Sequence, residues 1–300
     1  RINNIIAIVS VFGLTAKAQT ANPIKEPVYY SVESAVKARK AVQLNLRDRH
    51  YFNLPDEVGH LKHLTFLNLM GNNLEEWDAP LFNLGRLEVL NLQTNLLKYI
   101  PAKIGGMKTL LSLNLNDNDI ANVPAEIEKL KKLKFLYLSE NMLTGLPQEI
   151  GRCTNLEVLT LDDNQLSHLP ENISSLKNLK MLKIGRNQFN EFDNEWIQLK
   201  SLEQLDMEYN QLRGLPEAIG TLKKLTSIIA AYNRIESLPD GITKLENLEM
   251  LSLAHNKITK MPQDIAAMKG LKTLILAGNP IDNKEKERIK KALPGCQVFF

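Results

Sequence analysis

A motif that returns every 23 residues constrains the fold of this chain more than any other feature of its sequence. Asparagine occupies the same position in ten consecutive copies: Asn72, Asn95, Asn118, Asn141, Asn164, Asn187, Asn210, Asn233, Asn256 and Asn279. Arg49 stands one copy earlier, where the surrounding leucines and Pro55 keep the same frame. The chain therefore holds eleven copies of LxxLxLxxNxLxxLP without an insertion or a deletion. Such a repeat predicts a solenoid, in which each copy packs on its neighbours.

Each copy combines a strand with a helical turn. Leu136 and Leu138 alternate with polar or variable residues, which indicates a short strand with one buried face. Apolar residues then recur every three to four positions in P-x-x-I-G-x-L-x-x-L, as in a short helical turn. Stacked copies should bury these side chains in one continuous core. One column of that core is predicted at Leu61, Leu84, Met107, Leu130, Cys153, Leu176, Leu199, Leu222, Leu245 and Met268.

The asparagine column needs its own explanation, because a buried amide is unfavourable unless it forms hydrogen bonds. A turn at each corner leaves backbone N–H and C=O groups without partners. An inward asparagine can donate and accept at once, so it can bond to the backbone of its own and the adjacent repeat. We favour this structural role over ligand binding, because ten copies should serve the same corner.

The full motif, L-P-x-x-I-G-x-L-x-x-L-x-x-L-x-L-x-x-N-x-L-x-x-L-P, covers about 240 of the 300 residues. It resembles the 23-residue class of leucine-rich repeats in Ras-suppressor and Scribble-type scaffolds, plant disease-resistance proteins and exported bacterial proteins. The resemblance implies an α/β fold, a curved horseshoe with a parallel β-sheet on its concave side. It also implies that other proteins bind on that side.

The chain divides into four predicted segments: a signal peptide at 1–18, a leader and cap at 19–40, eleven repeats at 41–281 and a C-terminal cap at 282–300. The first segment has a basic start at Arg1, an apolar run from residue 5 to 14 and an A-x-A cleavage site that ends at Ala18. The apolar run is shorter than the ~20 residues of a membrane span. We therefore expect an exported protein without a membrane span.

Two helices are predicted to close the ends of the solenoid, because terminal repeats need caps. The first covers residues 31–40 and places Val32, Ala35 and Val36 on one face. The second begins at a capping box, residues 282–285, and ends before Pro294. Its apolar face consists of Ile289, Ala292 and Leu293, and a strand-like tail follows at residues 297–300.

Charge and cysteine content narrow the function classes. The formal net charge of +3 falls to +1 when Arg1 and Lys17 leave with the signal peptide, which argues against a nucleic-acid partner. One edge carries a column of lysines, which we interpret as solvated side chains that complement the dipoles of the helical turns: Lys62, Lys108, Lys131, Lys177, Lys200, Lys223 and Lys269.

The two cysteines, Cys153 and Cys296, lie too far apart to form a disulfide. Unpaired cysteines favour a bacterial periplasmic, cell-surface or extracellular protein over an animal extracellular one.

The sequence contains no motif of a known catalytic or nucleotide site, such as a P-loop, G-x-G-x-x-G, G-x-S-x-G or H-E-x-x-H. We therefore predict no catalytic residues, no cofactor and no metal site, and interpret His50, His60 and His63 as surface residues. Acids occupy one position in three successive repeats, at Asp117, Glu140 and Asp163. Their repulsion suggests a basic partner or a bound cation, although solvated acids are the simpler interpretation.

Strand positions that face away from the core line the concave side. The early repeats place asparagines there, whereas later repeats place aromatic, apolar and charged side chains, the composition of protein-binding hot spots. The predicted partner-binding residues are Phe135, Tyr137, Met181, Lys183, Arg186, Asp206, Glu208, Tyr209, Ile229, Tyr232 and His255. The alternative is that these side chains only form stabilising cross-strand pairs.

The sequence thus predicts a non-enzymatic protein–protein interaction module that binds its partner on the concave face. A glycan or another cell-surface polymer on the same face is the alternative ligand. A partner that resists competition by sugars would favour the first, and elution by surface glycans would favour the second.

Overall fold

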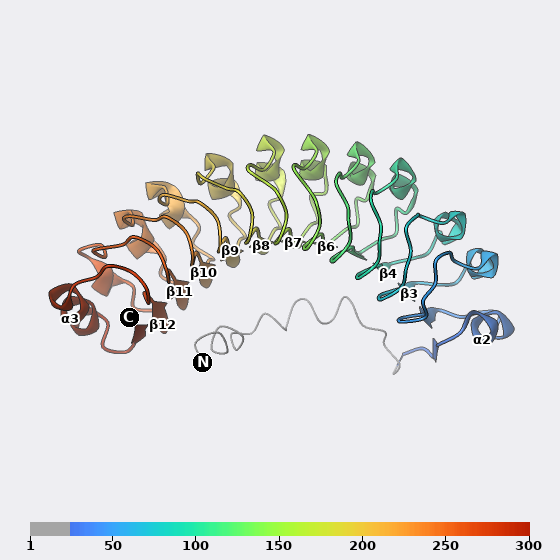
Figure 1. The fold of residues 1–300 in the computed structure, drawn as a ribbon, viewed down its shortest axis with the longest axis horizontal. Helices are drawn as coiled ribbons and strands as arrows, with labels where there is room; N and C mark the ends of the chain where they lie inside the picture. The colour runs from blue at the N-terminus through green and yellow to red at the C-terminus, as the bar shows by residue number, and fades with distance from the viewer. Residues whose placement is uncertain (1–24) are drawn as a thin grey trace.

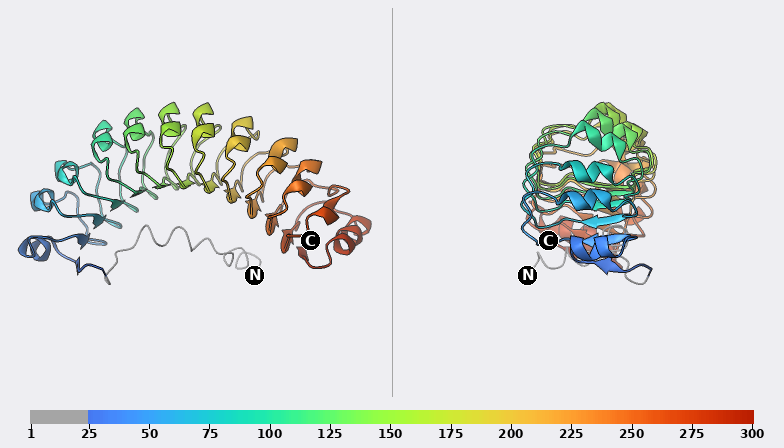
Figure 2. Two further views of the ribbon diagram at one scale, coloured as in Figure 1. Left: turned by 180° about the vertical axis from the view of Figure 1, so that it is seen from behind. Right: turned by 90° about the vertical axis from the view of Figure 1, so that its right-hand side faces the viewer.

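The repeats stack into one curved solenoid, seen in a computed structural model that describes residues 25–300. Figure 1 shows the strands along the inner curve and the helical turns along the outer curve. Figure 2 shows the same arc from behind, with a cap at each end. The predicted α/β horseshoe with a concave parallel sheet is confirmed. The predicted signal peptide lies outside the described residues.

Within residues 25–300, the inner face is one parallel sheet in which 13 strands follow one another in chain order. Its strands are β1 (Val28–Tyr29), β2 (Gln43–Asn45), β3 (Phe66–Asn68), β4 (Val89–Asn91), β5 (Ser112–Asn114), β6 (Phe135–Tyr137), β7 (Val158–Thr160), β8 (Met181–Lys183), β9 (Gln204–Asp206), β10 (Ser227–Ile229), β11 (Met250–Ser252), β12 (Thr273–Ile275) and β13 (Gln297–Phe299). Each repeat strand pairs with the next at an offset of 23 residues, as Leu136 does with Leu159. Equivalent side chains therefore form columns across the sheet.

The outer face consists of short 3-10 helices, tighter than α-helices. They are η2 (Asp56–His60), η3 (Ala79–Asn83), η4 (Ala102–Gly106), η5 (Ala125–Lys129), η6 (Gln148–Arg152), η7 (Glu171–Ser175), η8 (Asn194–Gln198), η9 (Glu217–Thr221), η10 (Asp240–Lys244) and η11 (Ile265–Ala267). In most repeats a proline precedes the helix, and its carbonyl accepts the first i to i+3 hydrogen bond, as Pro147 does from Ile150. Gly151 is required because a Cβ there would lie 2.2 Å from the Asn172 carbonyl oxygen.

The core between the two faces is a continuous stack of leucine, isoleucine and methionine side chains. Every member of the predicted column that includes Cys153 is buried. Burial raises the pKa of the Cys153 thiol to about 11, so it packs as an apolar residue. Cys153 and Cys296 are both free thiols.

The asparagine column is confirmed as a ladder of side-chain to backbone hydrogen bonds. Asn141 shows the arrangement: its Nδ2 donates to the carbonyls of Leu115 (2.9 Å) and Leu138 (3.1 Å). Its Oδ1 accepts from the buried amide of Ile120 at 3.0 Å. The Leu138 carbonyl also accepts from Asn164 of the next repeat, so the ladder is continuous.

The outer lysine column also has the predicted electrostatic role. Several of its members donate from Nζ to the last carbonyl of the next outer helix: Lys62 to Asn83, Lys131 to Arg152, Lys177 to Gln198 and Lys223 to Lys244. These carbonyls form the negative end of each turn. The lysines therefore stabilise the solenoid edge.

The N-terminal cap is shorter than predicted. Helix α2 (Val32–Lys37) is capped by Ser31 and ends before Arg39, whose φ of 56° lies in the left-handed region. Ala35 is fully buried, but Val36 is 42% exposed, so its assignment to the packed face was wrong. Successive residues of a helix lie about 100° apart, so Val36 points away from the first repeat when Ala35 points toward it.

The C-terminal cap agrees with the prediction. Helix α3 (Asn283–Ala292) begins at Asp282, whose Oδ1 accepts from the Glu285 amide at 2.7 Å. Ile289 and Leu293 are buried against the last repeat, and the tail adds β13 to the sheet. No helix within residues 25–300 is long and apolar enough to cross a membrane.

We expect Asn141→Ala to lower the free energy of unfolding by about 1–3 kcal/mol, because it leaves the buried Ile120 amide without an acceptor. Urea denaturation followed by circular dichroism measures this. Asn190→Ala, at an exposed position, is the control and should change stability by less than ~0.5 kcal/mol. Equal effects of the two substitutions would contradict the role of the ladder.

Candidate functional site

The residue before each ladder asparagine lies in the left-handed region of backbone space. From the sixth repeat onward these residues carry large or charged side chains: Asp163, Arg186, Tyr209, Tyr232 and His255, with φ between 50° and 53°. The conformation is unfavourable for residues other than glycine, yet the sharp corner that aims the asparagine inward requires it. Identical backbone angles at 23-residue spacing hold neighbouring side chains parallel.

Four of these side chains form a stack that we call the ring ladder: Arg186, Tyr209, Tyr232 and His255. The Arg186 guanidinium lies 4.1 Å from the Tyr209 ring centroid. The Tyr209 and Tyr232 rings lie 4.2 Å apart at 7°, and Tyr232 and His255 lie 4.3 Å apart at 14°. Stacked rings and an overlying guanidinium attract one another, so the four side chains hold one another in a fixed arrangement.

Neighbouring groups contact the side chains at both ends of the ring ladder. Arg186 Nε lies 3.8 Å from the Asp163 carboxylate. At the other end a Cβ on Gly278 would lie 2.5 Å from His255 Nδ1, so the Gly278 backbone covers the outer face of that ring. The ring faces are thus occupied from within, while Tyr209 and Tyr232 remain 36% and 39% exposed. The ladder therefore exposes ring edges and hydroxyl groups rather than ring faces.

Beside the ring ladder lies a half-buried acidic group, defined as Asp162, Asp206 and Glu208. Burial and, to a smaller extent, the Asp206 carboxylate raise the pKa of Asp162 to about 6. Burial and the Glu208 carboxylate likewise raise the pKa of Asp206 to about 6. Burial also raises the pKa of Glu208, against the opposing charge of Arg186. Lys183 counteracts the rise at all three carboxylates.

Apolar side chains lie next to the acidic group on the concave face. Tyr137 of β6, Val158 of β7 and Met181 of β8 form a cluster with the half-buried Phe135. Tyr137 is 3% exposed and Met181 is 1% exposed, so the expectation that both present open surface was wrong. Their neighbours on the inner curve cover them, and they act here as cross-strand pairs.

A second apolar cluster lies on the C-terminal side of the acidic group. Ala231, Met250, Ala254 and Ile275 are buried there, and Phe299 of β13 packs against them. Both clusters are buried, so neither presents an open apolar surface beside the acidic group.

The structure divides the predicted partner-binding residues among these features. Lys183, Asp206 and Glu208 meet at the acidic group, and the half-buried Ile229 pairs in register with Asp206. Sequence reasoning missed Asp162 and Thr160, which also face the concave side because Leu159 and Leu161 face the core. It also missed the stacking of the ring ladder. Counting 23 residues onward from Asp163 finds all four members.

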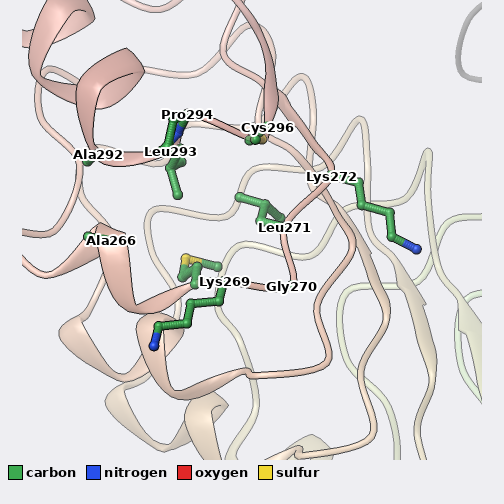
Figure 3. Close-up of a pocket in the computed structure, with 11 residues that line it drawn as sticks. Ala266, Lys269, Gly270, Leu271, Lys272, Ala292, Leu293, Pro294 and Cys296 are labelled. Carbon is green, nitrogen blue, oxygen red and sulfur yellow. The ribbon is translucent and has the colours of Figure 1, made fainter.

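A separate hollow of about 400 Å³ lies between the end of α3 and the last repeat, lined in part by Leu271, Leu293 and Cys296. Figure 3 shows the Lys272 side chain extending away from it. This hollow contacts neither the ring ladder nor the acidic group. Within the described part of the chain, no group of three or more His, Cys, Asp or Glu residues is placed to hold a metal ion.

Comparison with known families agrees with the geometry. A family model described as a leucine-rich repeat region matches residues 79–187, 116–206 and 164–297, which overlap to cover most of the chain. The chain belongs to the leucine-rich repeat family. Leucine-rich repeats commonly serve as protein–protein interaction modules, and the family is typically not enzymatic. No curated protein sequence matches this leucine-rich repeat chain.

Solved leucine-rich repeat structures are similar to it. An internalin, InlF, from Listeria monocytogenes has a TM-score of 0.73 and 20% identity over 90% of this chain and 82% of its own, which shows the fold. The Arabidopsis receptor kinase HAESA, in complex with the peptide hormone IDA and a co-receptor, has a TM-score of 0.67 and 26% identity. That match covers 82% of this chain and 47% of HAESA.

The plant peptide hormone receptor RGFR1, in complex with RGF2, has a TM-score of 0.66 and 26% identity over 90% of this chain. The match covers 53% of the receptor. The leucine-rich repeat chain described here thus spans about half the length of these two plant receptor chains.

We predict that the Asp162 and Asp206 carboxyl groups titrate near pH 6. Carbon-detected NMR of the side-chain carboxyls measures both midpoints. Asp206→Asn should lower the midpoint of Asp162, because it removes a negative charge that raises this pKa. Two midpoints near the ordinary aspartate value of ~3.9 would contradict the geometry of the acidic group.

The same shifts predict how stability depends on pH. The folded chain holds these protons more tightly than the unfolded chain, so stability should fall as pH rises from about 4 to about 6 and then level off. Urea denaturation at several pH values measures this slope. The double variant Asp162→Asn/Asp206→Asn should have a shallower slope than the wild type, and an unchanged slope would contradict the assignment.

Proposed function

We propose that this leucine-rich repeat protein is a non-enzymatic module that binds another protein across the concave face between β7 and β12. The ring ladder is the observation that carries the proposal. Its aromatic and arginine side chains are fixed by mutual stacking before any partner arrives. Pre-ordered aromatic and arginine side chains lose little conformational entropy on binding, and they dominate the energetics of protein interfaces.

The geometry favours a protein over a glycan as the ligand. A sugar ring packs its C–H face on an open aromatic face, whereas the faces in the ring ladder are covered by neighbouring rings, Arg186 and the Gly278 backbone. Ring edges, hydroxyls and a guanidinium match the mixed polar and aromatic surface of a polypeptide. The plant receptors in complex with peptide ligands, at 26% identity, support the same class of partner.

We further propose that the protein meets this partner outside the cytoplasm, in the bacterial periplasm, at the cell surface or in the medium. The basic start, apolar run and A-x-A site of residues 1–18 support export. Mass spectrometry of the protein recovered from its native source should give a mature N-terminus at Gln19. A mature protein that retains residues 1–18 would contradict this proposal.

The binding proposal is tested with Tyr209→Asn/Tyr232→Asn. Asparagine is tolerated in the left-handed region, so the backbone should keep its shape while the ring ladder is lost. Affinity capture from envelope extract and culture medium, with the mature chain as bait, should recover a protein that the double variant recovers at least about tenfold less well.

Tyr99→Asn serves as the control, because Tyr99 is 43% exposed and lies outside the ring ladder. Circular dichroism must show equal folding of all three baits. Equal recovery by wild type and double variant would overturn the proposed face. Elution of the captured material by surface glycans would favour the glycan alternative instead.

A further inference from the structure

The concave face around the acidic group carries more negative than positive charge. The charged side chains that influence its carboxylates are Asp162, Asp163, Lys183, Arg186, Asp206 and Glu208. Four are acids and two are bases, and Arg186 is already engaged by the Tyr209 ring and by Asp163. Half-buried carboxylates that repel one another are stabilised by an added cation, since fewer water molecules screen them.

A second, independent feature of this area is the Thr160 hydroxyl. Thr160 is 6% exposed, and its Oγ1 has no hydrogen-bond partner among the described residues. The residue faces the concave side of β7, in register with Lys183 of β8 and two positions before Asp162. A buried hydroxyl without a partner is unfavourable. It marks this part of the concave face as incompletely paired.

The two apolar clusters on this face are buried, with exposed fractions of 0–7%. The side chains of Asp162, Asp206 and Glu208 are half-buried, so they are more accessible to a partner than the apolar side chains beside them.

We propose that the partner presents an extended segment in which one lysine or arginine sits on the acidic group. This inference rests on the proposed function and specifies its partner. The segment crosses the strands along the solenoid, beside the ring ladder. Its basic side chain adds to the positive charge of Lys183, which the three carboxylates outnumber.

The protein's own repeats supply matched variants for the test. Asp206 Oδ1 accepts from the Glu208 amide, and Asn114 accepts from the Asn116 amide at the equivalent position. Asp206→Asn therefore reproduces an arrangement that the sheet already contains, without the charge. Glu171→Gln, on the exposed outer turn, removes one negative charge elsewhere and controls for net charge.

Asp162→Asn has a similar precedent in this chain. Asp162 Oδ1 accepts from the Gly185 amide of the next repeat at 2.9 Å, as Asn116 Oδ1 accepts from Ser139 at 2.8 Å. Both substitutions should therefore preserve the fold, which circular dichroism verifies. Loss of binding would then reflect the lost charge.

The experiment is a selection from a phage-displayed library of random linear peptides of about 12 residues, long enough to span several strands. The immobilised mature protein serves as the target. We expect the selected peptides to share a lysine or arginine. Fluorescence polarisation with synthetic copies should show at least about tenfold weaker binding to Asp162→Asn and to Asp206→Asn than to wild type.

Glu171→Gln should bind these peptides as the wild type does. Binding should strengthen between about pH 5 and pH 7, because the acidic group loses protons over this range and gains negative charge. A selection without a basic consensus, a selection without binders, or affinity unchanged in both aspartate variants would overturn the inference. Loss of capture by Tyr209→Asn/Tyr232→Asn would still support the proposed function, so the two can fail separately.

Discussion

The hydrogen bonds of the asparagine ladder are the constraint on which the rest of the structure depends. Each asparagine joins its own repeat to the preceding one, and carbonyls such as that of Leu138 accept from two successive asparagines. A corner that exposes backbone groups to the core is only tolerable when those groups are paired. The ladder pairs them identically in each copy and thereby holds the 23-residue register of the whole sheet.

The candidate binding face follows from that same corner. Pointing the asparagine inward places the residue before it in the left-handed region, and the constant register superimposes those residues across repeats. The ring ladder then requires only aromatic, histidine or arginine side chains at these positions, because the backbone of the repeats already aligns them. Glycine at the end of the series lets the last ring lie against the backbone. Structural constraint and proposed recognition thus share one backbone feature.

The sequence predicts most of the fold and only part of the site. Periodicity identifies the strands, the outer turns, the buried column around Cys153 and the role of Asn141, because each is repeated many times. It also places Tyr137 and Met181 on the concave side, but it cannot show that neighbours on an inward-curving sheet cover them. Nor can it show the raised pKa of Asp162, which depends on burial and on a carboxylate two repeats away.

Photo-crosslinking from the ring ladder tests the central claim most directly. A benzoylphenylalanine at position 232 keeps an aromatic ring in the stack, and the same group at position 99 labels exposed surface outside it. Irradiation in the native compartment should join the partner to position 232 and not to position 99. Crosslinks from position 99 alone would contradict the claim that the partner binds the concave face.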